Sequence, residues 1–164
     1  MRKSAGILLF RPGHHGPEVF LVHPGGPFWK YRNKGAWSIP KGEFGPAELP
    51  LHAAQREFFE ETGQTVEGPF IELEPVRQKS GKMVYAWAAA GEFDASSIVS
   101  NHYKMEWPQD SGNWQSYPEV DKAGWFSIEE ARELVNPAQE RFLDDLIEKL
   151  EGSQLLQSSK LSPK

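Results

Sequence analysis

The sequence predicts a mixed β-sheet covered by helices on both of its faces, an α/β/α arrangement. Three observations predict it: apolar strand-like runs precede a central helical segment, further strand-like runs follow it, and two helical segments close the chain. With 164 residues, 38% of them hydrophobic, the chain is long enough for one globular core and short for two. We therefore expect a single domain over residues 1–150 and a flexible polar tail over residues 151–164.

A β-hairpin is expected at the start of the chain. Apolar runs at residues 4–11 and 18–23 flank a stretch of proline, glycine and histidine, which indicates two strands joined by a loop. A second loop, residues 24–35, is rich in glycine, proline, aromatic and basic residues. It leads into a short apolar segment, residues 36–39, which Pro40-Lys41-Gly42 interrupts.

The central helix is expected over residues 47–62. These residues are good helix formers apart from Pro50, which a first helical turn tolerates, and Gly63 is suited to the cap at the end. At about 100° per residue, the helix face expected to pack on the sheet carries Leu51, Ala54 and Phe58.

Further strands and two helices are expected in the second half of the chain. Alternating apolar residues predict the strands, Ser127 is placed to cap a helix, and Pro137 is placed to open another. The expected elements are strands at 65–77, 82–90 and 98–106, an exposed aromatic-bearing loop at 108–118, a short strand at 125–126, and helices at 128–135 and 137–150.

Composition excludes several functional classes. The chain has no cysteine, so a bound metal must take oxygen or imidazole ligands, which favours a hard cation. A formal charge of −5 argues against a broad surface for duplex nucleic acid. The longest apolar runs, residues 5–10 and 83–90, are far shorter than the roughly 20 residues of a membrane span. Because Arg11-Pro12-Gly13 stops the first apolar run without a small-residue cleavage site, we expect a cytoplasmic protein with no membrane partner.

Three carboxylates converge on the central helix. Glu57 and Glu61 lie one turn apart on the same face, and Glu60 lies beside them. Unpaired carboxylates at this spacing repel one another and raise each other's pKa, so the arrangement favours a bound divalent cation. Arg56, four residues before Glu60, is placed to brace that carboxylate. An acidic stretch of this kind is more often simply a solvated helix face, so the stretch alone does not establish a metal site.

The residues around this stretch resemble the signature of the Nudix hydrolases, G-x5-E-x7-R-E-U-x-E-E-x-G-U. Every fixed position of that signature is occupied, by Gly42, Glu48, Arg56, Glu57, Glu60, Glu61 and Gly63. Phe58 and Gln64 depart from it, because both stand where the family has an aliphatic residue. The first departure alters packing, and the second weakens the expectation of a strand directly after the helix. The flanking segments at residues 39–42 and 125–126 also resemble the family.

The resemblance implies an α/β/α sandwich that uses Mg²⁺ or Mn²⁺ to hydrolyse a nucleoside diphosphate linked to another group. It implies that Glu57, Glu60 and Glu61 ligate the metal with the backbone carbonyl of Gly42, while Glu48 and Arg56 support them. Water is then the nucleophile. The general base is a glutamate of the helix or of a later loop, with Glu119 the first loop candidate and Glu106 the second.

Several side chains are candidates for binding the substrate. Lys41, beside the signature, is placed to meet a phosphate, and Lys30, Arg32 and Lys34 add positive charge in the preceding loop. Candidates to stack on a base are Tyr31, Tyr103, Trp107, Trp114 and Tyr117. From these sets, Lys41, Lys34, Tyr103 and Trp107 are the predicted substrate contacts. The five histidines show neither metal nor triad spacing, and we assign them no role.

The substrate is fixed only as a small nucleotide. Residues 37–42 resemble the entry to the signature in members that cleave dinucleoside polyphosphates such as diadenosine tetraphosphate. The proline that ADP-ribose-cleaving members carry beyond the signature has no counterpart near Ser80. We therefore expect a dinucleoside polyphosphate or nucleoside triphosphate first, and a nucleotide sugar or damaged nucleotide second. A non-catalytic sensing or binding module is the remaining alternative, although such modules usually lose the glutamates that this chain retains. Oligomeric state and the number of metal ions stay open.

Overall fold

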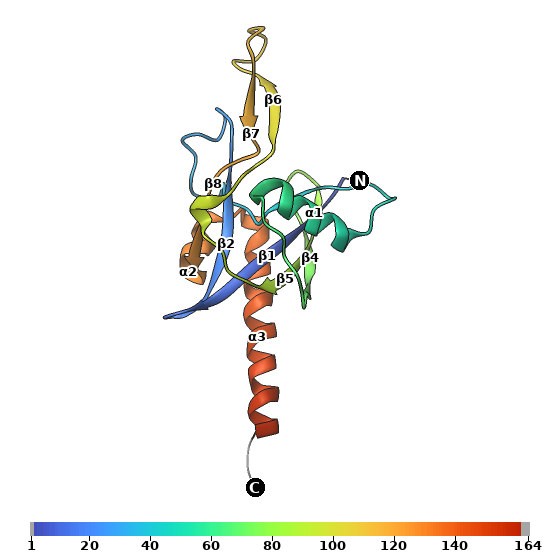
Figure 1. The fold of residues 1–164 in the computed structure, drawn as a ribbon, viewed down its shortest axis with the longest axis vertical. Helices are drawn as coiled ribbons and strands as arrows, with labels where there is room; N and C mark the ends of the chain where they lie inside the picture. Colours follow the sequence, from blue (N-terminus) through green and yellow to red (C-terminus); the bar gives the residue numbers. More distant parts are fainter. Residues whose placement is uncertain (1, 162–164) are drawn as a thin grey trace.

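The protein is built on a 6-stranded sheet with the order β4-β5-β1-β2-β8, and β3 pairs with β1 (Figure 1). The structure is a computed structural model that describes residues 2–161, with side chains described through residue 153. Strand β1 runs parallel to β5, while the pairs β1–β2, β1–β3, β2–β8 and β4–β5 are antiparallel. The sheet is therefore mixed, as the sequence predicts.

Strand β1 (Lys3–Gly13) forms the centre of the sheet. It makes the predicted hairpin with β2 (Gly16–Pro24) and lies between β2 and β5 (Met83–Ala90). Its side chains alternate between two buried cores, with Leu8 in one core and Ile7 and Leu9 in the other. This alternation shows that both faces of the sheet are covered.

Helices cover the two faces in the arrangement predicted. Helix α1 (Pro50–Thr62) packs on one face through Ala53, Ala54 and Phe58. Helices α2 (Ile128–Leu134) and α3 (Glu140–Leu161) cover the other face, and α3 is preceded by a 3-10 turn over Pro137–Gln139. The buried side chains from these two helices are Ala131, Phe142, Leu143 and Leu146. An α/β/α sandwich results.

Helix α1 differs from its prediction at its start and on its buried face. It begins at Pro50, whose fixed φ suits the first helical position, so residues 47–49 lie outside the helix. Ala53 is fully buried, while the predicted core residue Leu51 stays partly exposed. The predicted end is confirmed: Gly63 takes φ 77° and its N–H donates to the carbonyl of Phe59 at 2.7 Å.

Several strands differ from their predictions, and of the strand expected at 98–106 only the last five residues, β6 (His102–Glu106), are a strand. Lys41–Glu43, expected as an interruption, forms the short strand β3 against β1. Strand β4 (Ile71–Arg77) starts later than expected, because the residues after the helix include Gly68-Pro69, which suit a turn better than a ladder. Strand β8 (Val120–Ser127) is longer than the two residues expected, since it pairs along the whole of β2.

The expected exposed loop at 108–118 is partly wrong. Its second half forms β7 (Trp114–Pro118), which pairs antiparallel with β6 (His102–Glu106). This hairpin projects beyond the main sheet in Figure 1. The sequence did not indicate this pairing, because neither strand has the buried apolar face that produces an alternating pattern.

Helix α2 begins as predicted, with Ser127 in a capping box. The Ser127 hydroxyl accepts from the Glu130 N–H at 3.2 Å, and the Glu130 carboxylate accepts from the Ser127 N–H at 3.0 Å. At its other end, the carbonyls of Glu133 and Leu134 accept from the N–H groups of Gly35 and Trp37. This helix therefore holds the end of the 24–35 loop.

Helix α3 continues beyond the predicted end of the domain at residue 150, through Leu161. The flexibility expected of residues 151–164 stays a prediction, and residues 162–164 lie outside the described part of the chain. Within residues 2–161, no helix combines the length and the apolar character needed to cross a membrane.

Candidate active site

A cavity of about 600 Å³ lies beside α1 and β3. Its wall carries an acidic cluster of five glutamates and two lysines, contributed by β3, α1, the residue before β5 and the segment before β8. These residues are Glu43, Glu57, Glu60, Glu61, Glu119, Lys41 and Lys82. The volume falls in the range of small-molecule sites.

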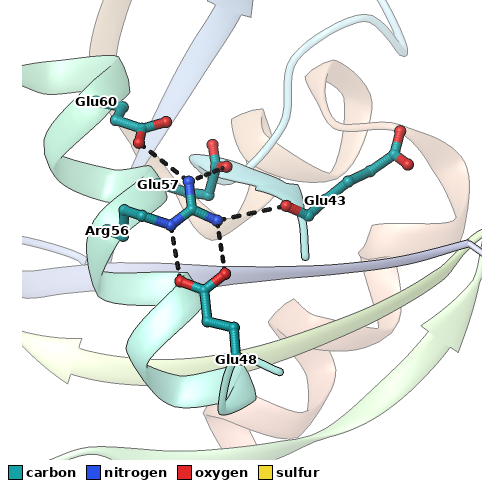
Figure 2. A network of polar contacts seen from close by, with 5 residues as sticks. All are labelled: Glu43, Glu48, Arg56, Glu57 and Glu60. Atoms are coloured by element: carbon teal, nitrogen blue, oxygen red, sulfur yellow. Dashed lines mark hydrogen bonds and ion pairs between the residues drawn. The ribbon is translucent and has the colours of Figure 1, made fainter. Parts of the chain in front are cut away.

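Arg56 is the centre of a polar network at the acidic cluster (Figure 2). Its guanidinium binds the two carboxylate oxygens of Glu48 at 2.7 and 3.0 Å, in a bidentate pair. It also donates to Glu57 at 2.8 Å and to Glu60 at 3.0 Å, which confirms the predicted contact with Glu60. One arginine thus fixes three carboxylates, and it holds the pKa of the Glu48 carboxyl below its usual value.

Gly42 is required because the Glu57 carboxylate lies directly against its backbone. A Cβ built on Gly42 would overlap the carboxylate of Glu57. The pairing of β3 with β1, which sets Gly42 opposite Ala5, fixes this position. Glycine therefore lets a carboxylate from α1 approach the backbone of β3, where the sequence signature joins the two elements.

Three carboxyl groups of the cluster, those of Glu57, Glu61 and Glu119, have raised pKa values. Burial raises the pKa of Glu61 to about 8, and the charges of Glu57 and Glu119 add to the increase. Burial and the neighbouring glutamates also raise the pKa of Glu57, against the opposing effect of Arg56. For one lysine of the cluster the shift is in the opposite direction: burial and the charge of Lys82 lower the pKa of Lys41. In the absence of a cation, removing the protons of these carboxyl groups is therefore unfavourable.

Glu119 reaches the cluster through a chain of backbone hydrogen bonds. The N–H of Asn101 donates to the carbonyl of Glu60 at 2.8 Å, and the carbonyl of Asn101 accepts from the N–H of Glu119 at 2.9 Å. The carbonyl of Glu119 accepts in turn from Gly25 at 2.9 Å. Burial and the charge of Glu60 raise the pKa of the Glu119 carboxyl. The predicted loop glutamate therefore lies at the same cavity as the helix glutamates.

Other predicted residues lie away from the cavity wall. Lys34, Tyr103 and Trp107 are not among its lining residues, and neither is Glu106. The Glu106 carboxylate instead accepts from the N–H groups of Asp110 and Gly112 in the β6–β7 turn. The hydroxyl of Tyr103 donates to the carbonyl of Gly25 at 3.0 Å. Their proposed contacts with substrate stay predictions.

Lys82 and a group of polar residues around Gln139 also line the cavity, and the sequence did not indicate them. Lys82 forms an ion pair with Glu43 at 3.2 Å, yet in the sequence it is an ordinary lysine after a Ser-Gly turn. Gln139 is buried and donates to Ser38 at 3.0 Å and to Gln78 at 3.2 Å. Because these partners are 101 and 61 residues away, no local pattern could have indicated this group.

The acidic cluster fits a hard divalent cation by its chemistry. Among the described side chains, no three acidic or histidine residues already have metal-ligand geometry, and Arg56 occupies one oxygen each of Glu57 and Glu60. The donors are nevertheless all oxygen, they line the same cavity, and burial together with mutual repulsion raises the pKa of Glu57, Glu61 and Glu119. Carboxylates in this state are suited to Mg²⁺ or Mn²⁺.

A sequence model of the NUDIX domain matches residues 1–146. The chain belongs to the NUDIX family. This membership supports a pyrophosphohydrolase and agrees with the signature found at Gly42 to Gln64. NUDIX hydrolases generally need a divalent metal, which the acidic cluster of this member suits. No sequence among curated proteins matches the chain significantly.

Solved NUDIX structures share the fold at low sequence identity. An Ap4A hydrolase from C. elegans, solved as a binary complex, superposes with a TM-score of 0.63 at 23% identity, covering 93% of this chain and 99% of that one. The NUDIX domain of Shewanella oneidensis NrtR, complexed with ADP ribose, gives 0.60 at 14% identity, covering 90% and 87%. A mutT/nudix family protein from Listeria innocua gives 0.59 at 17%, covering 94% and 97%. These similarities establish the fold.

Proposed function

We propose that this chain hydrolyses a phosphoanhydride bond of a nucleotide with Mg²⁺ or Mn²⁺ as cofactor. The observation that carries the proposal is the joining of Glu57, Glu60 and Glu61 from α1 with Glu119 at one cavity. The proposed small substrates are dinucleoside polyphosphates and nucleoside triphosphates, followed by nucleotide sugars and damaged nucleotides. We propose the cytoplasm as the place of action.

In this proposal the helix glutamates hold the cation. Glu57, Glu60 and Glu61 supply oxygen ligands, and Gly42 supplies its carbonyl and the space for Glu57. Arg56 and Glu48 fix the orientation of the ligands through their bidentate pair. When bound, the cation neutralises charge on the pyrophosphate and lowers the pKa of the attacking water.

The remaining charged residues act on the water and the phosphates. In this proposal Glu119, which lines the same cavity and has a raised pKa, accepts a proton from the attacking water. Lys41 and Lys82, which line the same cavity, offset charge on the phosphates of the substrate in this proposal. The water oxygen forms a bond to phosphorus, the anhydride P–O bond breaks, and the leaving phosphate keeps the electron pair.

A nucleotide panel tests this function. The wild-type protein is incubated with Mg²⁺ and each proposed nucleotide, and the products are separated by chromatography. Glu57→Gln and Glu60→Gln remove ligand charge with little change in shape, so we expect each to lower kcat by about 10²-fold or more. Glu67→Gln, an exposed glutamate beyond α1, is the matched control and should retain wild-type turnover.

Two results would overturn the proposal. One is the absence of product from every nucleotide in the panel, which would favour a binding module. The other is equal turnover by the wild type and both cluster variants.

A further inference from the structure

The loop before the NUDIX signature carries an unusual concentration of positive charge. Residues 24–35 contain Lys30, Arg32 and Lys34 and no acidic residue, although the whole chain has a formal charge of −5. The cavity beside it is lined by five glutamates and two lysines, so positive charge lies outside the cavity and negative charge inside. We call residues 27–34 the basic loop.

The basic loop presents aromatic rings to solvent next to its charges. Tyr31 is 88% exposed and Phe28 is 45% exposed. The Arg32 guanidinium lies 4.4 Å from the centroid of the Phe28 ring, and the Lys30 ammonium lies 5.4 Å from that of Tyr31. Within the described chain, none of the three cations is paired with a carboxylate. The Arg32 guanidinium also donates to the carbonyl of Phe28 at 3.2 Å. Exposed rings that alternate with cations not neutralised by a carboxylate are the pattern of a surface for single-stranded nucleic acid.

The basic loop is fixed in place by bonds to the body of the protein. The buried ring of His23 bonds to the carbonyl of Arg32 at 2.6 Å and to the carboxylate of Asp121 at 2.8 Å. The indole N–H of Trp37 donates to the Asn33 side chain at 2.6 Å. These contacts use the backbone and the asparagine of the loop, and leave its aromatic and basic side chains at the surface. The surface is therefore already formed before a ligand binds.

The basic loop is continuous with the catalytic cavity. Pro24, Trp29 and Ala36, which lie within and on either side of it, line the cavity wall. The Trp29 ring also contacts that of Phe28, with centroids 4.9 Å apart. A ligand chain that leaves the cavity past Trp29 therefore meets Phe28 and then the exposed cations.

The position of the cations indicates what kind of ligand fits. In a dinucleoside polyphosphate or a nucleoside triphosphate, the phosphates are occupied at the acidic cluster and its two lysines, and only an uncharged nucleoside extends outward. Such a nucleoside can stack on an aromatic ring, but it carries no phosphate that could bind three cations outside the cavity. Cations and rings together match a ligand that continues as alternating phosphodiesters and bases.

We propose that the basic loop binds single-stranded oligonucleotide, and that the protein hydrolyses the phosphoanhydride at an oligonucleotide end carrying a di- or triphosphate. This inference rests on the proposed function for the reaction and on the loop for the ligand. Water adds to phosphorus, the anhydride P–O bond breaks, and the leaving phosphate takes the electron pair while the water proton passes to a carboxylate. A triphosphate end is thereby shortened by phosphate or pyrophosphate.

Binding by the basic loop is measured without hydrolysis. The probe is a 3′-labelled RNA of about ten nucleotides with a 5′-hydroxyl end, which has no phosphoanhydride to cut, and the readout is fluorescence anisotropy. Lys30→Ala with Lys34→Ala removes two unpaired cations and should weaken binding about tenfold. The plot of log affinity against log salt concentration, whose slope is negative, should also become less steep by about 1.4. Tyr31→Ala should weaken binding about fivefold or more, and Tyr31→Trp should restore it.

The control removes the same charge from another surface. Arg141→Ala with Lys149→Ala takes two exposed cations from α3 and should leave both binding and nucleotide turnover unchanged. Thermal unfolding verifies that every variant is folded. If the basic-loop and α3 double variants bind the probe equally, or if the wild type does not bind it, the loop is not a nucleic-acid surface.

Hydrolysis is measured separately with wild-type protein and Mg²⁺. A 5′-triphosphorylated single strand of about ten nucleotides should be cut with a kcat/KM at least about tenfold above that of the matching nucleoside triphosphate. Ribose and deoxyribose probes show which sugar is accepted, and a blunt duplex should be cut more slowly. Turnover of small nucleotides with no advantage for the oligonucleotide would overturn this inference and leave the proposed function standing. No turnover of either would overturn the proposed function, while the binding experiment would still test the loop.

Discussion

At the scale of single residues, Gly42 matters for the space it leaves rather than for its flexibility. Alanine there places a Cβ where the Glu57 carboxylate lies. Since a glutamate end is mobile, we expect Gly42→Ala to move the carboxylate and cost little stability. A displacement of this carboxylate, a proposed metal ligand, by about 1 Å is enough to lower kcat about 10²-fold. Steady-state kinetics and thermal unfolding should therefore show a large loss of activity with a Tm change below about 3 °C.

Gly45→Ala is the matched control for that variant. A Cβ at Gly45 meets no atom within 4 Å, although it lies only three positions from Gly42. Wild-type kinetics are expected for it. A similar loss in both variants would mean that the loop, and not the Glu57 carboxylate, accounts for the effect.

Arg56 is the second residue whose role depends on geometry. It binds Glu48 through two nitrogens and also reaches Glu57 and Glu60. Lysine keeps the charge but lacks the planar fork, so Arg56→Lys should not replace it. We expect the affinity for Mg²⁺, measured by titration calorimetry, to fall about 10- to 100-fold in this variant. Arg11→Ala, which breaks ion pairs to Glu18 and Glu92, should bind Mg²⁺ like the wild type.

At the scale of elements, the capping box of α2 has a measurable effect on stability. Ser127→Ala leaves the first N–H groups of this short helix without their side-chain acceptor. The free energy of unfolding should fall by about 1 kcal/mol in urea titrations. Ser127→Asp supplies a carboxylate acceptor at the same place and should recover most of it. An equal loss in both variants would contradict the cap as the cause.

Elements with a local signal were predictable from the sequence, and those without one were not. Helix α1 and its end at Gly63 follow from residue preferences, and the Ser127 cap from a short motif. Strand β7 was missed because it pairs only with β6 and has no buried face to leave an apolar pattern. Strand β3 was missed because three residues form no periodicity, and only its pairing with β1 makes it a strand.

The candidate site shows the same division at the scale of the whole molecule. The glutamates of α1 and the residues that support them lie close in sequence, so together they match a family signature, although the acidic stretch by itself did not decide between a metal site and a solvated helix face. Glu119 was predicted only by family resemblance, because a backbone relay through Asn101 brings it to Glu60 from a distant segment. Lys82 and Gln139 had no signal, since tertiary pairing alone places them on the cavity.

The whole molecule also sets how stability depends on pH and metal. Glu61 has a pKa of about 8 in the folded protein and an ordinary pKa near 4.5 when unfolded. Below pH 4.5 it is protonated in both states and has no effect. As pH rises from 4.5 to 8, the unfolded state loses this proton more readily, so the free energy of unfolding falls. Burial also raises the pKa of Glu57 and Glu119, which therefore act in the same direction.

Metal-free protein should therefore lose Tm between pH 5 and pH 8, and Glu61→Gln should lose less, because its amide does not ionise. Mg²⁺ should raise the Tm of the wild type strongly at pH 8, where the cation meets an ionised cluster, and weakly at pH 5, where protons compete with it. Thermal unfolding in EDTA and in Mg²⁺ across this range measures both effects. If the EDTA curves of the wild type and Glu61→Gln run parallel, then repulsion and burial at Glu61 do not limit the stability of the fold. If Mg²⁺ stabilises the two proteins equally at pH 8, then Glu61 is not part of the cation site.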